Sequence, residues 1–208
     1  MNQSVWEADN RKTIEHFTCL IENYKCDFRS ADWGSKSSQE NRFKILTEIH
    51  DLSNKSILDV GCGIADLYQY LSRYNTNVAY TGYDITPAAI QHAAQRFPGI
   101  SLGVRDLSEE SNLTPEFDYV IASGIFYLRQ VNAMTYLEKI AANMFSLCRH
   151  GVAFNCLSIY AQHKKEGEFY ADPSAVLKVC LKITPWATIR HDYFPHDFTV
   201  YLYRESQA

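Results

Sequence analysis

The chain has 208 residues, of which 46% are hydrophobic, 13% aromatic and 21% charged. This balance is typical of a folded globular protein, and it excludes an intrinsically disordered chain. Lysine and arginine number 20 against 24 aspartate and glutamate residues, so the net charge is −4. That charge argues against a protein that binds nucleic acid through bulk electrostatics.

The sequence contains no recognisable targeting or membrane-spanning signal, so we expect an intracellular protein. No hydrophobic run approaches the roughly 20 residues that cross a bilayer, so we expect no membrane contact. Residues 1–9 lack a basic stretch followed by a hydrophobic one, so no signal peptide is predicted and a cytoplasmic location is expected. The six cysteines are therefore expected to be reduced. None has zinc-site spacing, and we expect no metal.

The first 50 residues read as helices. Hydrophobic side chains recur at helical spacing from Ile14 to Ile21, and a second helical pattern covers residues 39–49. We interpret residues 1–50 as a helical lid, followed by the main domain at residues 51–208.

From residue 55 onward, short hydrophobic strands alternate with amphipathic helices. Strands are expected at residues 56–60, 77–84, 100–106, 117–123 and 152–157, with helices at 66–74, 86–97 and 134–148 and a turn at 150–151. This alternation predicts a parallel sheet with right-handed crossovers and helices on both faces.

The end of the chain breaks the alternation. A helix is expected from residue 172 to 182, and strands at 187–193 and 198–203 follow each other too closely for a crossover. They predict an antiparallel hairpin. The predicted fold is therefore α/β, an open sheet of mainly parallel strands with a C-terminal antiparallel hairpin.

Residues 57–63 read ILDVGCG, a strand that runs into two glycines before a helix. Glycines let the backbone turn sharply and approach a ligand, and the helix N-terminus directs N–H groups at it. Asp84 ends the next strand, 21 residues after Gly63, where a carboxylate suits two ribose hydroxyls. Alone, this pattern fits any nucleotide-binding α/β fold.

Two acidic residues narrow the choice of ligand. A dinucleotide site needs a third glycine for close helix–strand packing, but Asp66 stands at that position. Asp59 places a carboxylate where a pyrophosphate would lie, which is a repulsive match. The loop therefore favours a cationic ligand, such as a sulfonium that carries an amino group.

These motifs resemble those of the class I S-adenosylmethionine-dependent methyltransferases, a family with a Rossmann-like fold. The resemblance covers about residues 40–205. Residues 57–63 look like the first motif of the family, 83–85 like the second, 104–107 like the end of the third strand and 117–125 like the fourth-strand motif. The N-terminal segment also resembles a branch of small bacterial members through a Trp-Gly-Ser loop and a Gln…Arg-Phe helix. Ala65 departs from the glycine of many members.

The resemblance implies S-adenosylmethionine (SAM) as cofactor. It implies that Asp84 holds the ribose, that Asp106 holds the adenine edge, and that the Trp-Gly-Ser segment closes over the methionine carboxylate with Arg42 as its partner. The implied cofactor-binding residues are Trp33, Ser35, Arg42, Asp59, Gly61, Gly63, Asp84, Ile85, Asp106, Leu107, Ser123 and Ile125.

The acceptor side is less specific in sequence. The candidate catalytic residues are His191, Asp192 and Tyr193, with His163 and His196 as further candidate bases. Surface or capping roles for these residues stay open. The candidate acceptor-pocket residues are Phe126, Tyr127, Tyr160, His163 and Tyr170, for which ordinary core or rim positions are an equal alternative.

The leading hypothesis is a SAM-dependent methyltransferase that acts on an oxygen or nitrogen atom of a small-molecule acceptor, as a monomer or homodimer. Residues 123–126 read SGIF and lack the Asn/Asp-Pro-Pro-aromatic pattern of enzymes that methylate planar nitrogens, which further disfavours nucleic acid. The alternatives are a protein methyltransferase, a non-catalytic module that binds an adenosyl ligand, and a nicotinamide-dependent oxidoreductase.

Overall fold

A computed structural model of the chain describes residues 6–74, 77–128 and 131–208, so residues 1–5 of the expected lid lie outside the described part. The elements are α1 (Glu7–Tyr24), the 3₁₀ helix η1 (Phe28–Ala31), α2 (Lys36–Thr47), β1 (Ser56–Val60), α3 (Asp66–Ser72), β2 (Ala79–Asp84), α4 (Pro87–Arg96), β3 (Ser101–Val104), β4 (Phe117–Ala122), α5 (Ala133–Leu147), β5 (Cys148–Leu157), α6 (Pro173–Ile183), β6 (Ala187–Phe194) and β7 (Asp197–Tyr203).

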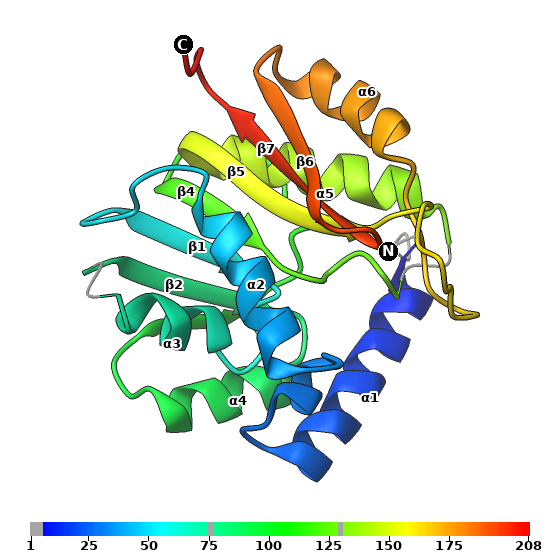
Figure 1. Cartoon of the computed structure of the whole chain (residues 1–208). Helices are drawn as coiled ribbons and strands as arrows, with labels where there is room; N and C mark the ends of the chain where they lie inside the picture. The colour runs from blue at the N-terminus through cyan, green and yellow to red at the C-terminus, as the bar shows by residue number, and fades with distance from the viewer. Residues whose placement is uncertain (1–5, 75–76, 129–130) are drawn as a thin grey trace.

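The strands of the described part form one seven-stranded sheet in the order β3-β2-β1-β4-β5-β7-β6 (Figure 1). Strands β1 to β5 pair in parallel, whereas β7 runs antiparallel to both β5 and β6. The predicted α/β sheet with its antiparallel C-terminal hairpin is confirmed. The second strand of the hairpin lies between β5 and β6, so β6 forms the sheet edge.

The turn expected at residues 150–151 is wrong, because β5 already begins at Cys148. Gly151 pairs with Tyr119 of β4 and with Tyr203 of β7, and these two neighbours hold the chain extended. A Cβ atom at position 151 would come within 2.8 Å of the Leu202 carbonyl oxygen. Glycine is therefore needed here for close approach of β7, not for a turn.

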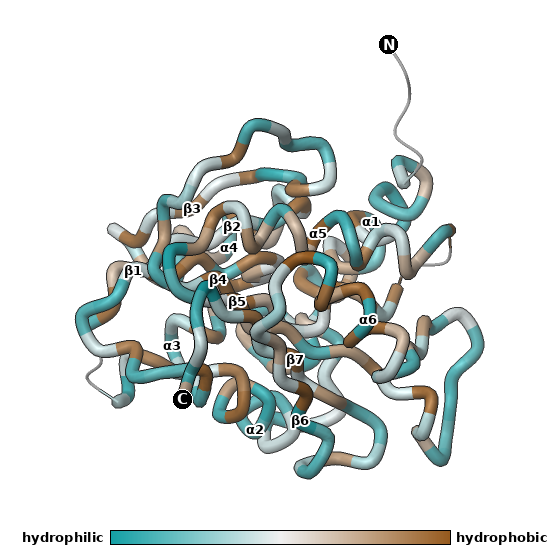
Figure 2. The backbone as a smooth tube through the Cα atoms, turned by 90° about the horizontal axis from the view of Figure 1, so that it is seen from above, coloured by the Kyte–Doolittle hydropathy of each residue, from teal (hydrophilic) through white to brown (hydrophobic). Residues whose placement is uncertain are grey.

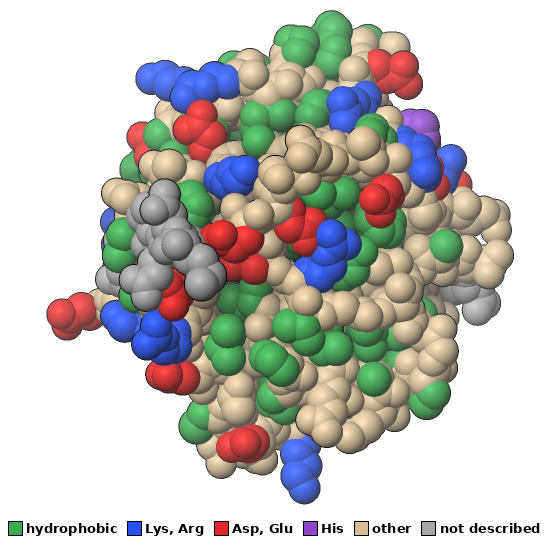
Figure 3. Space-filling model, turned by 180° about the vertical axis from the view of Figure 1, so that it is seen from behind, with side chains coloured by type: hydrophobic (Ala, Val, Ile, Leu, Met, Phe, Trp, Pro, Cys, Tyr) green, Lys and Arg blue, Asp and Glu red, His purple; other side chains and the backbone are tan. Residues whose placement is uncertain are grey.

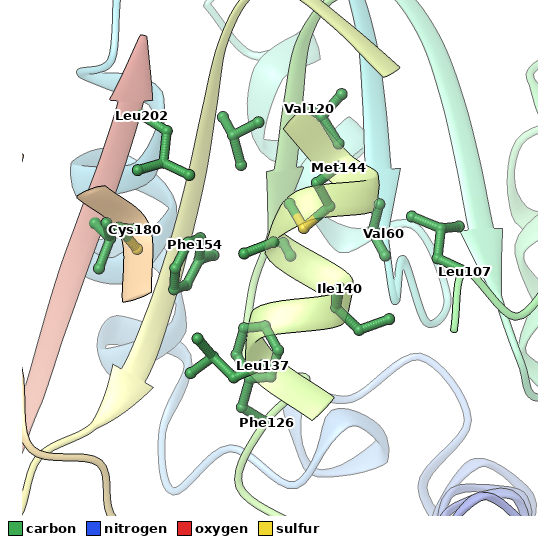
Figure 4. Packing of buried hydrophobic residues seen from close by; sticks show 14 of the residues in the cluster. Val60, Leu107, Val120, Phe126, Leu137, Ile140, Met144, Phe154, Cys180 and Leu202 are labelled. Carbon is green, nitrogen blue, oxygen red and sulfur yellow. The ribbon is translucent and has the colours of Figure 1, made fainter. Parts of the chain in front are cut away.

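Alternate side chains of the central strands enter two separate cores. Leu58 and Val120 face α5 and α6, where Ile140 is among the α5 side chains packed against the sheet (Figure 4). Ile57 and Ile121 face α2 and α3 on the opposite side. Seen from above, hydrophobic residues gather around the central strands and hydrophilic ones lie in the surrounding loops (Figure 2). The strand period of two thus explains the layers.

The N-terminal helices differ in how they pack. Helix α2 belongs to the core layer, with Phe43 and Leu46 against the sheet. Helix α1 lies outside that layer beside α4 (Figure 1), where Ile21 contacts Ile64 and Ala89. No helix in residues 6–74, 77–128 and 131–208 is long and hydrophobic enough to cross a membrane. The six cysteines are free thiols.

Candidate cofactor and acceptor site

A cavity of about 420 Å³ lies where β1, β2 and β4 end, with residues of α1 and η1 among its walls. The carboxyl ends of parallel strands meet at one edge of a sheet, which is where open α/β folds bind ligands. The volume is within the usual range of small-molecule sites, roughly 300–1,000 Å³. All the implied cofactor residues except Ser35 line this cavity.

The loop after β1 is shaped by two glycines with positive φ, +71° at Gly61 and +53° at Gly63. A Cβ atom at position 61 would collide with Ile125, so only glycine fits there without rearrangement. The backbone N–H groups of Gly61 and Cys62 donate to the Tyr83 carbonyl at 2.7 and 3.1 Å. These bonds fix the loop against the end of β2.

Asp84 connects this loop to the start of α4. Its Oδ2 accepts from the Gly63 N–H at 2.8 Å, and its Oδ1 accepts from the Thr86 N–H at 2.7 Å. Burial raises the pKa of Asp84, and the two N–H donors oppose that shift. Each carboxylate oxygen keeps acceptor capacity, which suits the two hydroxyls of a ribose.

Asp59 is a buried carboxylate in the wall of the cavity, with 2% of its surface exposed. Tyr80 donates its hydroxyl to Asp59 Oδ2 at 2.7 Å. Burial is the main cause that raises the pKa of Asp59 to about 7; the Tyr80 hydroxyl opposes this shift, and the nearby acidic residues Asp84 and Asp66 contribute to it. A cationic ligand in the cavity would favour the charged carboxylate, as the sequence predicts.

At the end of β3, Asp106 connects the cavity to α1. Its Oδ1 accepts from the Ser108 N–H at 2.8 Å, and its Oδ2 accepts from the side chain of Asn10. Sequence reasoning missed Arg105, which lies 4.5 Å from the Tyr83 ring centroid and also lines the cavity. Helix α1 is thereby tied to the expected adenine end.

Ser123 lies where β4 ends, and its buried hydroxyl has no hydrogen-bond partner among the described residues. The next residue, Gly124, has φ +72° and donates its N–H to Asn155 Oδ1 at 2.9 Å. A Cβ atom at position 124 would lie 3.2 Å from the Trp33 ring. An unpaired hydroxyl beside a glycine cradle fits a site that is completed by a ligand.

Arg42 lines the cavity but already has an anionic partner in the protein. Its Nε donates to Asp197 Oδ2 at 2.7 Å, and its guanidinium lies over the rings of Trp33 and Phe194. Its expected role on the methionine carboxylate would have to be shared with Asp197. Ser35 lies outside the cavity lining and caps α2 by accepting from Ser38 N–H at 3.1 Å.

The three candidate catalytic residues are outside the cavity lining. His191 donates to the Pro195 carbonyl at 3.3 Å, and the exposed Asp192 pairs with Arg190. Tyr193 donates to Asp197 Oδ1 at 2.6 Å, and burial together with that carboxylate raises its pKa.

The two further candidate bases do line the cavity. His163 lies on the loop after β5, and His196 lies in the turn before β7. His196 Nε2 is 3.3 Å from Nη2 of Arg42, and arginine can only donate, so this imidazole nitrogen accepts. Burial and the positive charge of Arg42 lower the pKa of His196. A neutral imidazole therefore stands at this wall.

The candidate acceptor residues divide in the same way. Phe126, Tyr127, His163 and Tyr170 line the cavity, whereas Tyr160 is 63% exposed and outside the lining. Phe126 is also part of the core (Figure 4). Sequence reasoning missed the charged residues at this end, which are Asp32, Lys165 and Glu168.

Comparisons with known proteins agree with this geometry. A family model described as a methyltransferase domain matches residues 51–194. The Mycobacterium tuberculosis protein Rv1506c, which is named as a methyltransferase, is 32% identical over 158 residues, 73% of this chain and 94% of that protein. The magnesium protoporphyrin IX methyltransferase of Synechocystis PCC 6803 with bound SAM superposes with a TM-score of 0.69, at 13% identity, covering 99% of this chain and all of that one.

A second solved structure has the same fold. The N-methyltransferase NodS of Bradyrhizobium japonicum WM9, in complex with S-adenosylhomocysteine (SAH), superposes with a TM-score of 0.65 at 16% identity, covering 95% of this chain and all of that one. Fold and site define the class I SAM-dependent methyltransferases. The chain belongs to the methyltransferase-domain family, and SAM is its cofactor.

Proposed function

We propose that this enzyme methylates an oxygen or nitrogen atom of a small-molecule acceptor. The observation that carries the proposal is the cavity, which continues from the glycine loop to the residues after β4 and β5 and is lined by residues of α1 and η1. Its volume of about 420 Å³ is in the range of small-molecule sites. Figure 3 shows basic side chains scattered over the face it presents rather than gathered into a patch.

Different residues of the cavity are proposed to bind the cofactor and to orient the acceptor. Asp84, Asp106 and the glycine loop are proposed to hold the ribose, adenine and methionine parts of SAM, as the resemblance to the family implies. When bound, SAM supplies an electrophilic methyl group that the lone pair of the acceptor attacks. The protein then has to orient and desolvate the acceptor. We assign that task to Tyr127, Tyr170 and the lid formed by α1 and η1.

Base catalysis follows the positions of the histidines. His196 lines the cavity as a neutral imidazole, but its Nε2 already accepts from Arg42, so we propose His163 as the histidine that takes the proton of a hydroxyl acceptor. The hairpin residues His191, Asp192 and Tyr193 lie outside the cavity lining, so we propose a supporting role for Tyr193 through Asp197. A cytoplasmic location and a monomeric or homodimeric state remain part of the proposal.

The proposal is tested by following the methyl group. The enzyme is incubated with methyl-labelled SAM in two parallel reactions. One contains the small-molecule fraction of a bacterial lysate, and the other contains its protein fraction. Label in the small-molecule fraction, lost with Asp84→Asn, is the expected result. Label in the protein fraction alone would favour a protein methyltransferase. SAM binding with label in neither fraction would favour the non-catalytic module.

A further inference from the structure

Three segments that are distant in sequence meet at the acceptor end of the cavity. Tyr127, which follows β4, donates its hydroxyl to Asp32 Oδ2 at 2.8 Å, and Asp32 ends η1 in the lid. The loop after β5 contributes Glu168, which accepts from the Tyr170 hydroxyl at 2.5 Å. The same loop contacts Tyr127 through the Phe169 N–H, which donates to the Tyr127 carbonyl at 2.7 Å. Burial and the negative charges of Asp32 and Glu168 raise the pKa of Tyr127.

The charged side chains at the acceptor end of the cavity differ in whether they have a fully charged ion-pair partner within the protein. Lys165 forms an ion pair with Glu168 at 3.3 Å, and Arg42 is taken by Asp197. The only ion-pair partner of Asp32 among the described residues is His16, an imidazole that is 39% exposed and charged only when protonated. With a neutral His16, this end of the cavity carries an excess of one negative charge.

A second observation marks the same stretch of the lid as a ligand contact. Ser30 lies two residues before Asp32, lines the cavity and is 2% exposed. Its hydroxyl oxygen has no hydrogen-bond partner in the described part of the chain. A buried unpaired hydroxyl costs free energy, and a donor on the acceptor molecule would remove that cost.

We propose that the methyl acceptor is an amine, recognised as its ammonium form by the Asp32 carboxylate and the Ser30 hydroxyl. This inference rests on the proposed small-molecule methyltransfer. An ammonium group offers N–H donors and one positive charge, which match the two oxygens and the excess negative charge. A carboxylate acceptor would meet like charge at Asp32, and an alcohol, although it can donate to the carboxylate as Tyr127 does, would add no positive charge to balance it.

The position of Asp32 also suits the proton that must leave. An ammonium ion has no lone pair, so the bound amine gives one proton to solvent before its nitrogen attacks the methyl carbon. Asp32 is 33% exposed and lies 3.1 Å from His16 Nε2, which places a carboxylate–imidazole pair between the cavity and water. The C–S bond then breaks, its electron pair stays on sulfur, and the products are the methylated ammonium and SAH.

The variant Asp32→Asn isolates the charge of this group. Residue 32 has φ +58°, a left-handed conformation that asparagine adopts as readily as aspartate. The amide oxygen of asparagine still accepts from Tyr127, so the lid contact is kept. Glu22→Gln is the matched control, because it removes one negative charge from the exposed surface of α1 outside the cavity lining.

The test measures binding to SAH-loaded protein by ligand-observed saturation-transfer NMR, with benzylamine, benzyl alcohol and benzoate as probes. We expect benzylamine to bind most tightly, and Asp32→Asn to weaken it about tenfold while Glu22→Gln leaves it unchanged. A preference for benzoate or benzyl alcohol, binding of none of the probes, or an unchanged benzylamine affinity in Asp32→Asn would overturn the inference. Failure of SAH itself to bind, measured separately by calorimetry, would instead overturn the proposed function.

Discussion

The guanidinium Nε of Arg42 donates to Asp197 Oδ2 at 2.7 Å, although 155 positions separate the two residues. Their side chains are 4% and 1% exposed, so the ion pair is almost completely removed from water. It joins α2 to the first residue of β7, beside the cavity. Asn155 and Tyr193 donate to the same carboxylate, which satisfies its remaining acceptor sites.

Breaking this pair is expected to be costly. Arg42→Met leaves Asp197 buried without its cation, and we expect it to lower the free energy of unfolding by about 3–5 kcal/mol. The exposed pair Arg73–Glu40 is the control, and Arg73→Met is expected to cost less than about 1 kcal/mol. Urea unfolding measures both. Equal effects of the two substitutions would show that burial does not set the strength of the Arg42 pair.

Removal of the Ser123 hydroxyl is expected to affect protein stability and SAM affinity differently. Ser123→Ala removes a buried hydroxyl that has no hydrogen-bond partner in residues 6–74, 77–128 and 131–208, so the free protein is expected to keep its stability or gain up to about 1 kcal/mol. SAM affinity is expected to fall, as measured by calorimetry. Ser108→Ala is the matched control, since that hydroxyl is also buried and lacks a partner within the described part of the chain, but lies outside the cavity lining. A fall in affinity for Ser108→Ala alone would contradict the site.

The two glycines of the first loop are expected to respond differently to alanine. Both have positive φ, but a Cβ atom at position 61 collides with Ile125, whereas a Cβ atom at position 63 has no described residue within 4 Å apart from its chain neighbours. Gly61→Ala should therefore lose about 2 kcal/mol or more of stability and most SAM binding, and Gly63→Ala about 1 kcal/mol. Adding Ile125→Ala should recover part of the stability of Gly61→Ala. No recovery would mean that backbone strain, not the collision, dominates.

Asp59 predicts a pH dependence of stability with a definite sign. Its pKa is about 7 in the folded protein, against about 3.9 in an unfolded chain. Between these values the folded state holds the proton more tightly, so stability falls as pH rises from about 4 to about 7 and then levels off. Asp59→Asn does not titrate and therefore lacks this loss of stability. At pH 8 its free energy of unfolding should exceed that of the wild type by about 2–4 kcal/mol. Parallel stability curves for the two proteins would contradict the assignment.

Local patterns in the sequence predict the fold well, and all the implied cofactor residues except Ser35 line the cavity where β1, β2 and β4 end. The strand period of two, the glycines after β1 and the acidic residue at the end of β2 are all set by neighbouring residues, and each element lies close to its expected bounds. The exception is the start of β5, which depends on contacts with distant strands. Gly151 was expected in a turn because only its pairing with β4 and β7, distant in sequence, shows that it lies in a strand.

The rest of the site depends on contacts between distant segments. Three residues of the cavity wall are held in place by side-chain hydrogen bonds to residues far away in the sequence. They are Asp197, Asn155 and Asp32, and the partners lie 155, 42 and 95 positions away. No local sequence pattern reveals such contacts. In the hairpin, the register between β6 and β7 shifts between Arg190 and Phe194. Sequence alternation therefore could not tell which of the clustered polar residues face the cavity.

The most direct test of the account is titration of SAH into the wild type and into Asp84→Asn, followed by calorimetry. The amide keeps one acceptor oxygen for the Gly63 or Thr86 N–H but no longer offers a carboxylate to a ribose. We predict one SAH per chain for the wild type and an affinity about 10- to 100-fold lower for Asp84→Asn. No binding of SAH by the wild type, together with tight binding of NAD, would contradict the assignment of this cavity.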